Sequence, residues 1–533
     1  MLTHSTRRWL AGLGVAGAFV AASASPAAAA APAVEYSLYF QNVTIALDSP
    51  GVEAQPRLYG SKASILNEVS VRYDYRSLTG KVTLAGGTGN DCSPDGAGIL
   101  TCVEHLPFVV DEVYGGFFGD VLIAPTDEAA AGDTGELKIS VTSAGKSVAT
   151  YASRIQIGEG VDLAGGPDTE VEASPGSAFQ VPLTVRNVGR TDVEAVVALF
   201  DTDYGIRAKD RFDNCFYEED FLLACEFDEP IPAGSGGTTT INYEVAKDAY
   251  APGNESGDIW LLTPADFASL NNARAKVGAP AARKGTGKTL SLTPLAGARG
   301  ARGQQTDTDP SNNHSALSVD VTGKNGADLE AVGATFTGKK GAVLTAALGF
   351  RNNGPATLER IRTKTDVTFV DVTVPTGTTA VAVPAECAPR TGNKAEWGAA
   401  GTPGAAEYRC YPGPFAPVGE ELTGEFSFRI DTVVTDATGM VKVNVPCECE
   451  GGFYADLKPA NDTAKILVNA ASGNGDGGTG DNGGTGGGDS GAGGGLPITG
   501  QSTGLIAGLG ALLLVAGVGG YLVAKRRRTR FVA

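Results

Sequence analysis

Histidine is scarce in this chain. Among 533 residues there are three histidines: His4, His105 and His314. Neither His105 nor His314 lies in the spacing of a nucleophilic or zinc site, and we expect His4 to be removed with an export signal. A Ser–His–Asp, Cys–His or histidine–zinc mechanism would have to use one of the remaining two. We interpret His105 as a surface strand residue and His314 as a turn residue, which leaves these mechanisms without a site.

Aromatic residues are also few, at 7% of the chain, which leaves little material for a sugar-binding cleft. A hydrolase that uses two carboxylates needs no histidine, but acidic residues are so plentiful here that no pair stands out. The run Lys284–Thr289 lacks the first glycine of a phosphate loop, because residue 282 is alanine. We therefore predict that the protein is not an enzyme and uses no cofactor, and we assign no metal site.

Helical periodicity is nearly absent, and apolar residues alternate with polar ones instead. Clear alternation occurs in three early strands and three late strands, each bounded by Gly, Pro or Asn turns. The early strands contain Val69–Tyr75, Phe179–Val185 and Leu344–Phe350, and the late ones Leu137–Val141, Ile241–Val245 and Phe426–Ile430. Such antiparallel sheets hide one face against a second sheet, so we predict an all-β chain of tandem β-sandwiches.

Internal repeats suggest how many sandwiches there are. Residues 309–313 (DPSNN) and 458–462 (KPAND) each precede a closing strand, and new units open at Val161 and Ala327. The sequence therefore predicts three sandwich domains: 32–160, 161–325 and 326–470. The last two resemble immunoglobulin-like repeats of bacterial surface proteins, the cell-adhesion-related type, on their N-x-G and P-x-N turns. The resemblance is weak in residues 34–160, which lack the P-x-N turn.

Eight cysteines lie between the two ends of the chain, and an even number in an exported protein implies disulfides. Each predicted domain carries a close pair before its late strand, and we pair Cys92 with Cys102, Cys215 with Cys225, and Cys387 with Cys410. Cys447 and Cys449 are harder, because a bridge across one residue is strained. They could also pair with Cys387 and Cys410, so this pairing stays open.

The N-terminus has the layout of an export signal. Arg7 and Arg8 precede an apolar run and then an alanine tract, which predicts a signal peptide over residues 1–31. The alanine tract leaves the cleavage site open. The pair Arg7-Arg8 also partly fits a twin-arginine signal, although general secretion is favoured.

The C-terminus carries three elements in order. These are the pentapeptide Leu496, Pro497, Ile498, Thr499 and Gly500, the uncharged apolar span 504–524, and the basic tail 525–533. The span is long enough to cross a bilayer as a helix, and the basic tail would stay inside the cell. The triplet resembles the LPxTG sorting signal of Gram-positive surface proteins. The resemblance implies that a sortase cuts after Thr499 and joins the chain to peptidoglycan, so the membrane contact is transient.

Residues 471–495 are nearly all Gly, Ser, Asn, Asp and Thr and are predicted to form a flexible linker. The chain carries a net charge of −18, and both ends are basic, so the exported part is still more acidic. Such a surface disfavours nucleic acid as a partner. It is compatible with divalent cations, and Asp201, Asp203 and Glu218–Asp220, with Glu226–Glu229, supply oxygen ligands. None follows the twelve-residue calcium loop, so calcium binding stays open.

Residues 267–306 contain no acid and several basic residues, and we expect a long, mobile basic insertion in the second domain. It could contact anionic wall polymer or an acidic partner, or it could be a tolerated insertion. Taken together, the sequence predicts a cell-surface protein anchored to peptidoglycan by a sortase, with a structural or adhesive role toward an unidentified extracellular protein or glycan. The alternative is an exported, wall-anchored hydrolase that uses carboxylates in residues 34–160.

Overall fold

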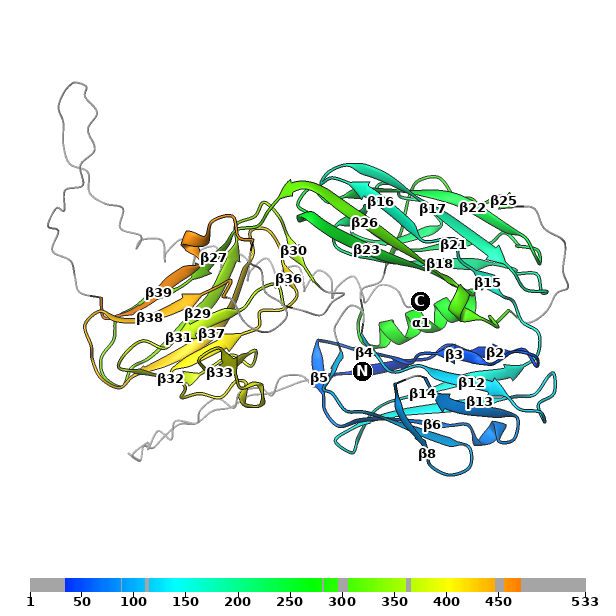
Figure 1. Ribbon diagram of the computed structural model, residues 1–533, viewed down its shortest axis with the longest axis horizontal. Helices are drawn as coiled ribbons and strands as arrows, with labels where there is room; N and C mark the ends of the chain where they lie inside the picture. Colours follow the sequence, from blue (N-terminus) through cyan, green and yellow to red (C-terminus); the bar gives the residue numbers. More distant parts are fainter. Residues whose placement is uncertain are drawn as a thin grey trace, which may run out of the picture. The chain divides into compact units, whose positions relative to one another are not determined.

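A computed structural model describes residues 34–470 except 88, 111–114, 280–281, 296–304, 361–365 and 446–454 (Figure 1). The predicted signal peptide (1–31), the linker (471–495), the sorting signal (496–533) with its span 504–524, and Cys447 and Cys449 lie outside the described residues. Within the described ranges, no helix is both long and apolar enough to span a membrane. We refer to residues 34–160, 161–325 and 326–470 as the first, second and third segments.

The prediction of an all-β chain is confirmed for the described residues, because nearly all regular structure is strand. Each segment has its own cluster of buried apolar side chains, within residues 38–157, 161–321 and 327–466. The alternation read from the sequence is visible in the burial, since Phe179, Val181, Leu183 and Val185 all point into the second core. Leu344 and Ala346 of the third segment are only half-buried, although Ala346 packs against the third core and Leu344 against a smaller buried cluster.

The largest sheets of the three segments share one strand order over their first six strands, and the second and third segments add a seventh. In the first segment it is β2 (Val43–Ile45), β14 (Lys146–Ile157), β13 (Thr134–Ser143), β6 (Val69–Asp74), β9 (Ile99–Glu104) and β8 (Asp91–Pro94). In the second it is β16 (Thr169–Ala173), β26 (His314–Asn325), β23 (Ala251–Leu262), β18 (Val196–Thr202), β21 (Phe221–Phe227), β20 (Cys215–Glu218) and β24 (Arg283–Lys284). In the third it is β28 (Ala334–Phe336), β39 (Thr463–Val468), β38 (Ala437–Lys442), β31 (Val370–Thr373), β35 (Glu407–Cys410), β33 (Cys387–Thr391) and β34 (Lys394–Ala395). The first two strands of each list pair in parallel, whereas the other neighbours are antiparallel.

Smaller sheets supply the remaining strands. In the first segment they are β3 (Val52–Ala54), β12 (Val121–Pro125) and β7 (Val82–Gly86); β1 (Tyr36–Tyr39), β4 (Arg57–Gly60) and β11 (Gly116–Phe117); and β10 (Phe108–Val110) with β5 (Ser64–Leu66). In the second they are β15 (Leu163–Ala164), β17 (Ala178–Asn187), β22 (Gly236–Val245) and β19 (Ile206–Ala208), with β25 (Thr293–Leu295) on β22. In the third they are β27 (Leu329–Val332), β29 (Val343–Asn352), β37 (Glu421–Ile430) and β32 (Thr378–Ala382), and β30 (Leu358–Glu359) with β36 (Phe415–Ala416). Short 3₁₀ turns occur at Arg76–Leu78, Pro310–Asn312, Trp397–Ala399 and Pro459–Asn461.

The three close cysteine pairs are confirmed as disulfides: Cys92–Cys102, Cys215–Cys225 and Cys387–Cys410. Each joins directly opposed residues on two neighbouring strands, β8 and β9, β20 and β21, or β33 and β35. These strand pairs occupy the same place in the shared order. The first segment therefore matches the other two in sheet order and disulfide position, which its turn sequence did not reveal.

The repeated turn motifs have a structural role in both later segments. Asn187 and Asn352 are each 1% exposed, and each side-chain amide donates to two backbone carbonyls while its oxygen accepts from a glycine two residues on. Asn312 and Asn461 donate to Asp162 and Asp328. Buried polar groups need such partners, so these residues stabilise turns and are not available for chemistry.

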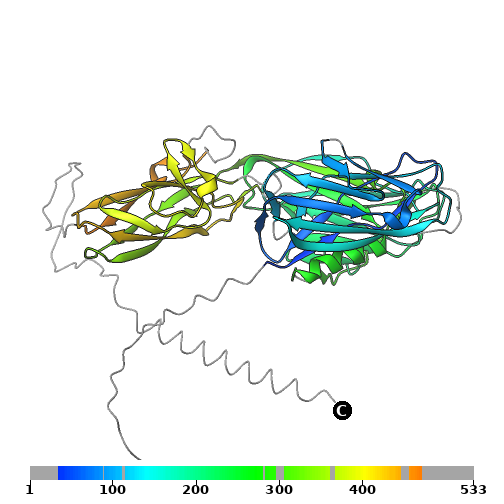
Figure 2. The same ribbon diagram turned by 90° about the horizontal axis from the view of Figure 1, so that it is seen from below.

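The expectation of a mobile basic loop over 267–306 is wrong for much of its described part. The chain instead forms helix α1 (Pro264–Lys276), and β24 and β25 each join a sheet. Thr263 caps the helix, because its hydroxyl accepts from the Asp266 amide, and proline occupies the first turn. Leu270 and Ala273 of α1 form a buried cluster with Tyr39 of β1 and Tyr59 of β4, and Figures 1 and 2 both show α1 beside strands of the first segment.

Candidate functional site

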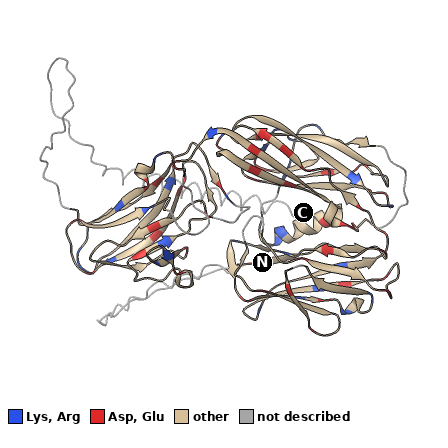
Figure 3. Ribbon diagram, viewed as in Figure 1, with Lys and Arg blue, Asp and Glu red and all other residues tan. Residues whose placement is uncertain are grey.

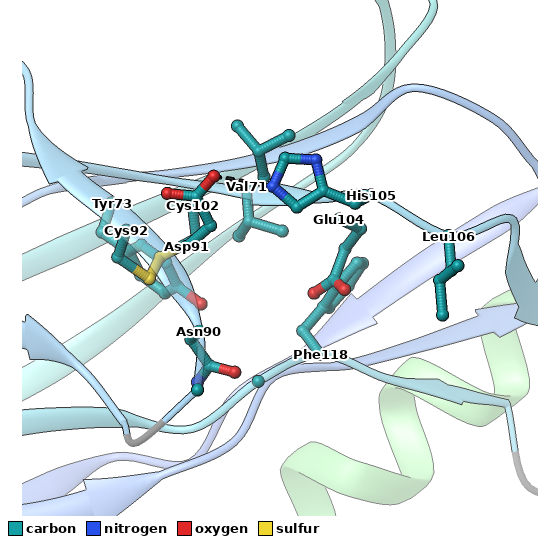
Figure 4. A pocket seen from close by; sticks show the side chains of 13 residues that line it. Val71, Tyr73, Asn90, Asp91, Cys92, Cys102, Glu104, His105, Leu106 and Phe118 are labelled. Carbon is teal, nitrogen blue, oxygen red and sulfur yellow. Dashed lines mark hydrogen bonds and ion pairs between the residues drawn. A yellow bond between two sulfur atoms is a disulfide. The ribbon is translucent and has the colours of Figure 1, made fainter.

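A small hollow of about 220 Å³ lies in the first segment, beside the Cys92–Cys102 disulfide (Figure 4). Asn90, Asp91, Glu104 and His105 provide its polar side chains. His105 Nε2 lies 2.7 Å from Asp91 Oδ2, but the two side chains are 70% and 61% exposed. An ion pair this exposed to water contributes little to stability. The two cysteines of the hollow are bonded to each other and cannot act as nucleophiles. No nucleophile–base pair is therefore present among the residues that line this hollow.

His105 is exposed, as predicted, but it directly follows β9 and is not a strand residue. His314 is the first residue of β26, not part of the turn itself; its Nε2 lies 2.7 Å from Asp258 Oδ1, and its ring packs on Trp260. The two histidines thus lie in different segments, each paired with one carboxylate. The two histidines therefore do not belong to one shared site.

A groove of about 610 Å³ is lined by residues of all three segments. This volume falls in the range of small-molecule and glycan-sized sites, which often lie where domains meet. One wall comes from β18 and β21 of the second segment, another from β4 and α1, and Phe415 of β36 closes the third side. We refer to it as the junction groove.

Contacts between the second and third segments fix the Phe415 wall. The rings of Tyr204 and Phe415 lie 5.1 Å apart. The hydroxyl groups of Tyr204 and Thr357 both donate to Asp248 Oδ2, at 2.8 and 2.7 Å. One carboxylate therefore ties the second segment's turn to the third segment beside the groove.

Three arginines line the junction groove: Arg57, Arg207 and Arg274. The guanidinium of Arg207 lies between the rings of Tyr204 and Phe221, 4.1 Å from each centroid. Arg57 lies 3.9 Å from the centroid of Phe117, and its Nη1 donates to the Tyr59 hydroxyl. Stacking of this kind holds a guanidinium by its faces.

The carboxylates proposed from the sequence as calcium ligands do not gather at one point. Asp201, Glu218 and Glu219 line the junction groove, whereas Asp220 pairs with Arg211 and Glu226 pairs with Lys284. The structure thus divides these acidic residues between the groove and two separate ion pairs.

Asp203 instead belongs to a carboxylate cluster with Glu255 of β23 and Glu359 of β30, whose oxygens lie within 4.8 Å of one another. Asp203 and Glu255 are buried; the Gly205 amide donates to Glu255, and the Ser256 amide and hydroxyl donate to Asp203. Three hard oxygens at this spacing could hold a divalent cation or share a proton. Sequence reasoning missed Glu255 and Glu359, because they lie far along the chain from Asp203.

The pKa of Glu255 is raised to about 8, mainly by burial and also by the charges of Asp203 and Glu359, against the lowering effect of the Gly205 amide and Arg207. The folded chain therefore binds this proton more tightly than the unfolded chain does. Stability must then fall as pH rises from the unfolded value, near 4.5, through about 8.

Glu255→Gln should remove this part of the pH dependence, because the amide is neutral and can still accept from Gly205. We expect the variant to be more stable than the parent chain at pH 9 by on the order of 2 kcal/mol, with little difference at pH 5. Urea denaturation at both pH values measures it, with exposed Glu172→Gln as the control. Equal differences at the two pH values would contradict the assignment. If millimolar calcium removed the parent's deficit at pH 9, a cation would replace the proton.

No family model and no curated protein matches this chain. Solved structures with some likeness include native Escherichia coli alpha-2-macroglobulin, at 8% identity and a TM-score of 0.17, covering 64% of this chain and 19% of that one. A titin I-band fragment, I67–I69, has 9% identity and a TM-score of 0.15, over 83% and 99% of the two chains. A Porphyromonas gingivalis W83 protein of unknown function has 14% identity and a TM-score of 0.13, over 43% and 91%. TM-scores this low carry no argument about fold or function.

Proposed function

We propose that this chain is an exported surface protein that a sortase joins to peptidoglycan, and that its three segments are immunoglobulin-like sandwiches with a binding role. The order of pentapeptide 496–500, apolar span and basic tail carries the anchoring part of this proposal. The three disulfides support it, because such bonds persist in oxidising compartments outside the cell.

The repeated strand order supports the sandwich part of the proposal. In each segment a short early strand pairs in parallel with the last strand, and the disulfide-bearing strands lie beside the central ones. A binding role fits the junction groove, which combines apolar walls with a few charged side chains. For the alternative, a carboxylate hydrolase in the first segment, the hollow of Figure 4 offers Asp91 and Glu104, of which Asp91 is exposed and paired with His105.

Mass spectrometry of the wall-bound protein tests the anchoring. Cell walls are digested with a muramidase, and the C-terminal peptide of the released chain is sequenced. We expect it to end at Thr499, with a wall peptide joined through an amide to the threonine carboxyl. A released chain that still contains residues 500–533, or a chain extracted by detergent alone, would refute sortase anchoring and leave a one-span membrane protein.

A further inference from the structure

The three arginines of the junction groove differ from eight other arginines of the described residues that form ion pairs with acids. Ion pairs hold Arg72, Arg76, Arg190, Arg211, Arg351, Arg390, Arg409 and Arg429. Within the described ranges, no ion pair joins Arg57, Arg207 or Arg274 to a carboxylate. This is so although three carboxylates line the same groove. No carboxylate of the described residues neutralises these three guanidinium groups, so their charge can act on a ligand.

The position of Arg207 suits it to bind an anion. Its guanidinium carbon lies over the rings of both Tyr204 and Phe221, and the residue is half-buried and lines the groove. A guanidinium that stacks by its face can still donate from its N–H groups in the plane. A guanidinium fixed in this way loses little side-chain entropy when it binds, and its fork matches the two oxygens of a carboxylate or phosphate. Arg57 is fixed similarly over Phe117.

The groove also offers groups that an inorganic anion would not use. Asp201, Glu218 and Glu219 can accept hydrogen bonds from hydroxyl groups. Leu223 and Phe415 provide apolar surface for the C–H faces of a ring. A ligand that carries anionic groups, many hydroxyls and apolar ring faces fits all three kinds of side chain.

We propose that the junction groove binds an acidic glycan, a sugar chain that bears carboxylate or phosphate groups. Arg207, Arg57 and Arg274 hold the anionic groups, and Asp201, Glu218 and Glu219 accept from the hydroxyls. The inference rests on the proposed function only in that an exported chain meets such polymers. It also gives the basic helix α1 a role, because Arg274 reaches the groove from its last turn.

Calorimetric titration of the purified full chain tests the proposal. The probes are oligogalacturonate, which carries carboxylates, a phosphorylated mannooligosaccharide, which carries phosphates, and a neutral maltooligosaccharide. We expect binding of at least one acidic probe and none of the neutral one. Arg207→Gln should weaken binding about 10-fold or more, because a charge-assisted hydrogen bond is lost. Arg207→Lys should weaken it too, since an ammonium group lacks the planar fork.

Arg186→Gln is the matched control, because Arg186 is an exposed arginine on β17, in the other sheet of the same segment. Its affinity should equal that of the parent chain. Arg274→Gln, at the end of α1, gives a second variant if Arg207→Gln fails to fold. Binding of the neutral probe as tight as that of the acidic ones, no binding of either acidic probe, or equal affinities for the groove variants and the control would each overturn the proposal. Wall attachment, measured separately, should be unchanged in every variant, so failure here does not touch the anchoring.

Discussion

Asp371→Ala should lower the melting temperature of the third segment by roughly 10 °C, which corresponds to a loss of about 3–5 kcal/mol. Asp371 on β31 is 4% exposed and accepts two bonds from Arg409, from Nε at 2.7 Å and from Nη2 at 2.9 Å. Arg390 Nη1 lies 3.1 Å from the same carboxylate. Arg409 is itself 1% exposed, so the truncation would leave a buried guanidinium without its counter-charge.

Scanning calorimetry measures this effect, and two further variants show its cause. Glu421→Ala breaks the exposed pair with Arg351, whose closest atoms are 3.8 Å apart, and should change stability by less than about 1 kcal/mol. Asp371→Leu combined with Arg409→Met removes both charges and should recover part of the loss. Acidic and basic positions are spread over many strands of the chain, so a matched exposed pair is easily found (Figure 3). Similar melting temperatures for Asp371→Ala and Glu421→Ala would show that burial does not strengthen the Asp371–Arg409 pair.

Leu270→Ala should destabilise helix α1 and its contact with the first segment by about 2–5 kcal/mol. Leu270 is 5% exposed and packs with Tyr39, Tyr59 and Ala273, which are also buried. Removing three carbons leaves a cavity that the tyrosine rings cannot close without moving, and both rings belong to strands of another segment. Hydrogen exchange measured by mass spectrometry gives the opening free energy of the α1 amides directly.

Asn271→Ala is the control for this helix, because Asn271 is exposed and alanine favours helix. Its amides should exchange as slowly as those of the parent chain, or more slowly. Peptides from β1 and β4 should exchange faster in Leu270→Ala only. If α1 opened while β1 and β4 kept the parent rates, the cluster would stabilise the helix without joining the two segments.

The sequence was sufficient for those parts of the fold that depend on short-range patterns. Alternation such as Phe179 to Val185 predicts a half-buried strand, because side chains alternate between the two faces of a sheet. The three disulfides followed from close spacing, since each pair closes a short stretch of antiparallel strand. The burial of Asn187 and Asn352 explains why the N-x-G turns repeat.

Residues 267–306 were predicted to form a loop because they are basic and contain no acid, and helix α1 was therefore missed. The signal was present in Thr263, Pro264 and Asp266, which form a helix start, followed by Phe267 and Leu270 three residues apart. The junction groove and the carboxylate cluster could not be read in the same way. Arg207 and Phe221, or Asp203 and Glu359, come together only through the packing of strands distant in the chain, and no local pattern marks them.

If the chain is anchored to the wall as proposed, the parallel pairing of an early strand with the last strand has a mechanical consequence. In the second segment β16 pairs with β26 over five residues, and in the third β28 pairs with β39 over three. A pull between a partner and the wall draws the start of one strand and the end of the other in opposite directions along the same axis. The hydrogen bonds between them lie across that axis and are loaded together in shear. This ladder must therefore break as a set before the chain between β16 and β26, or between β28 and β39, can stretch.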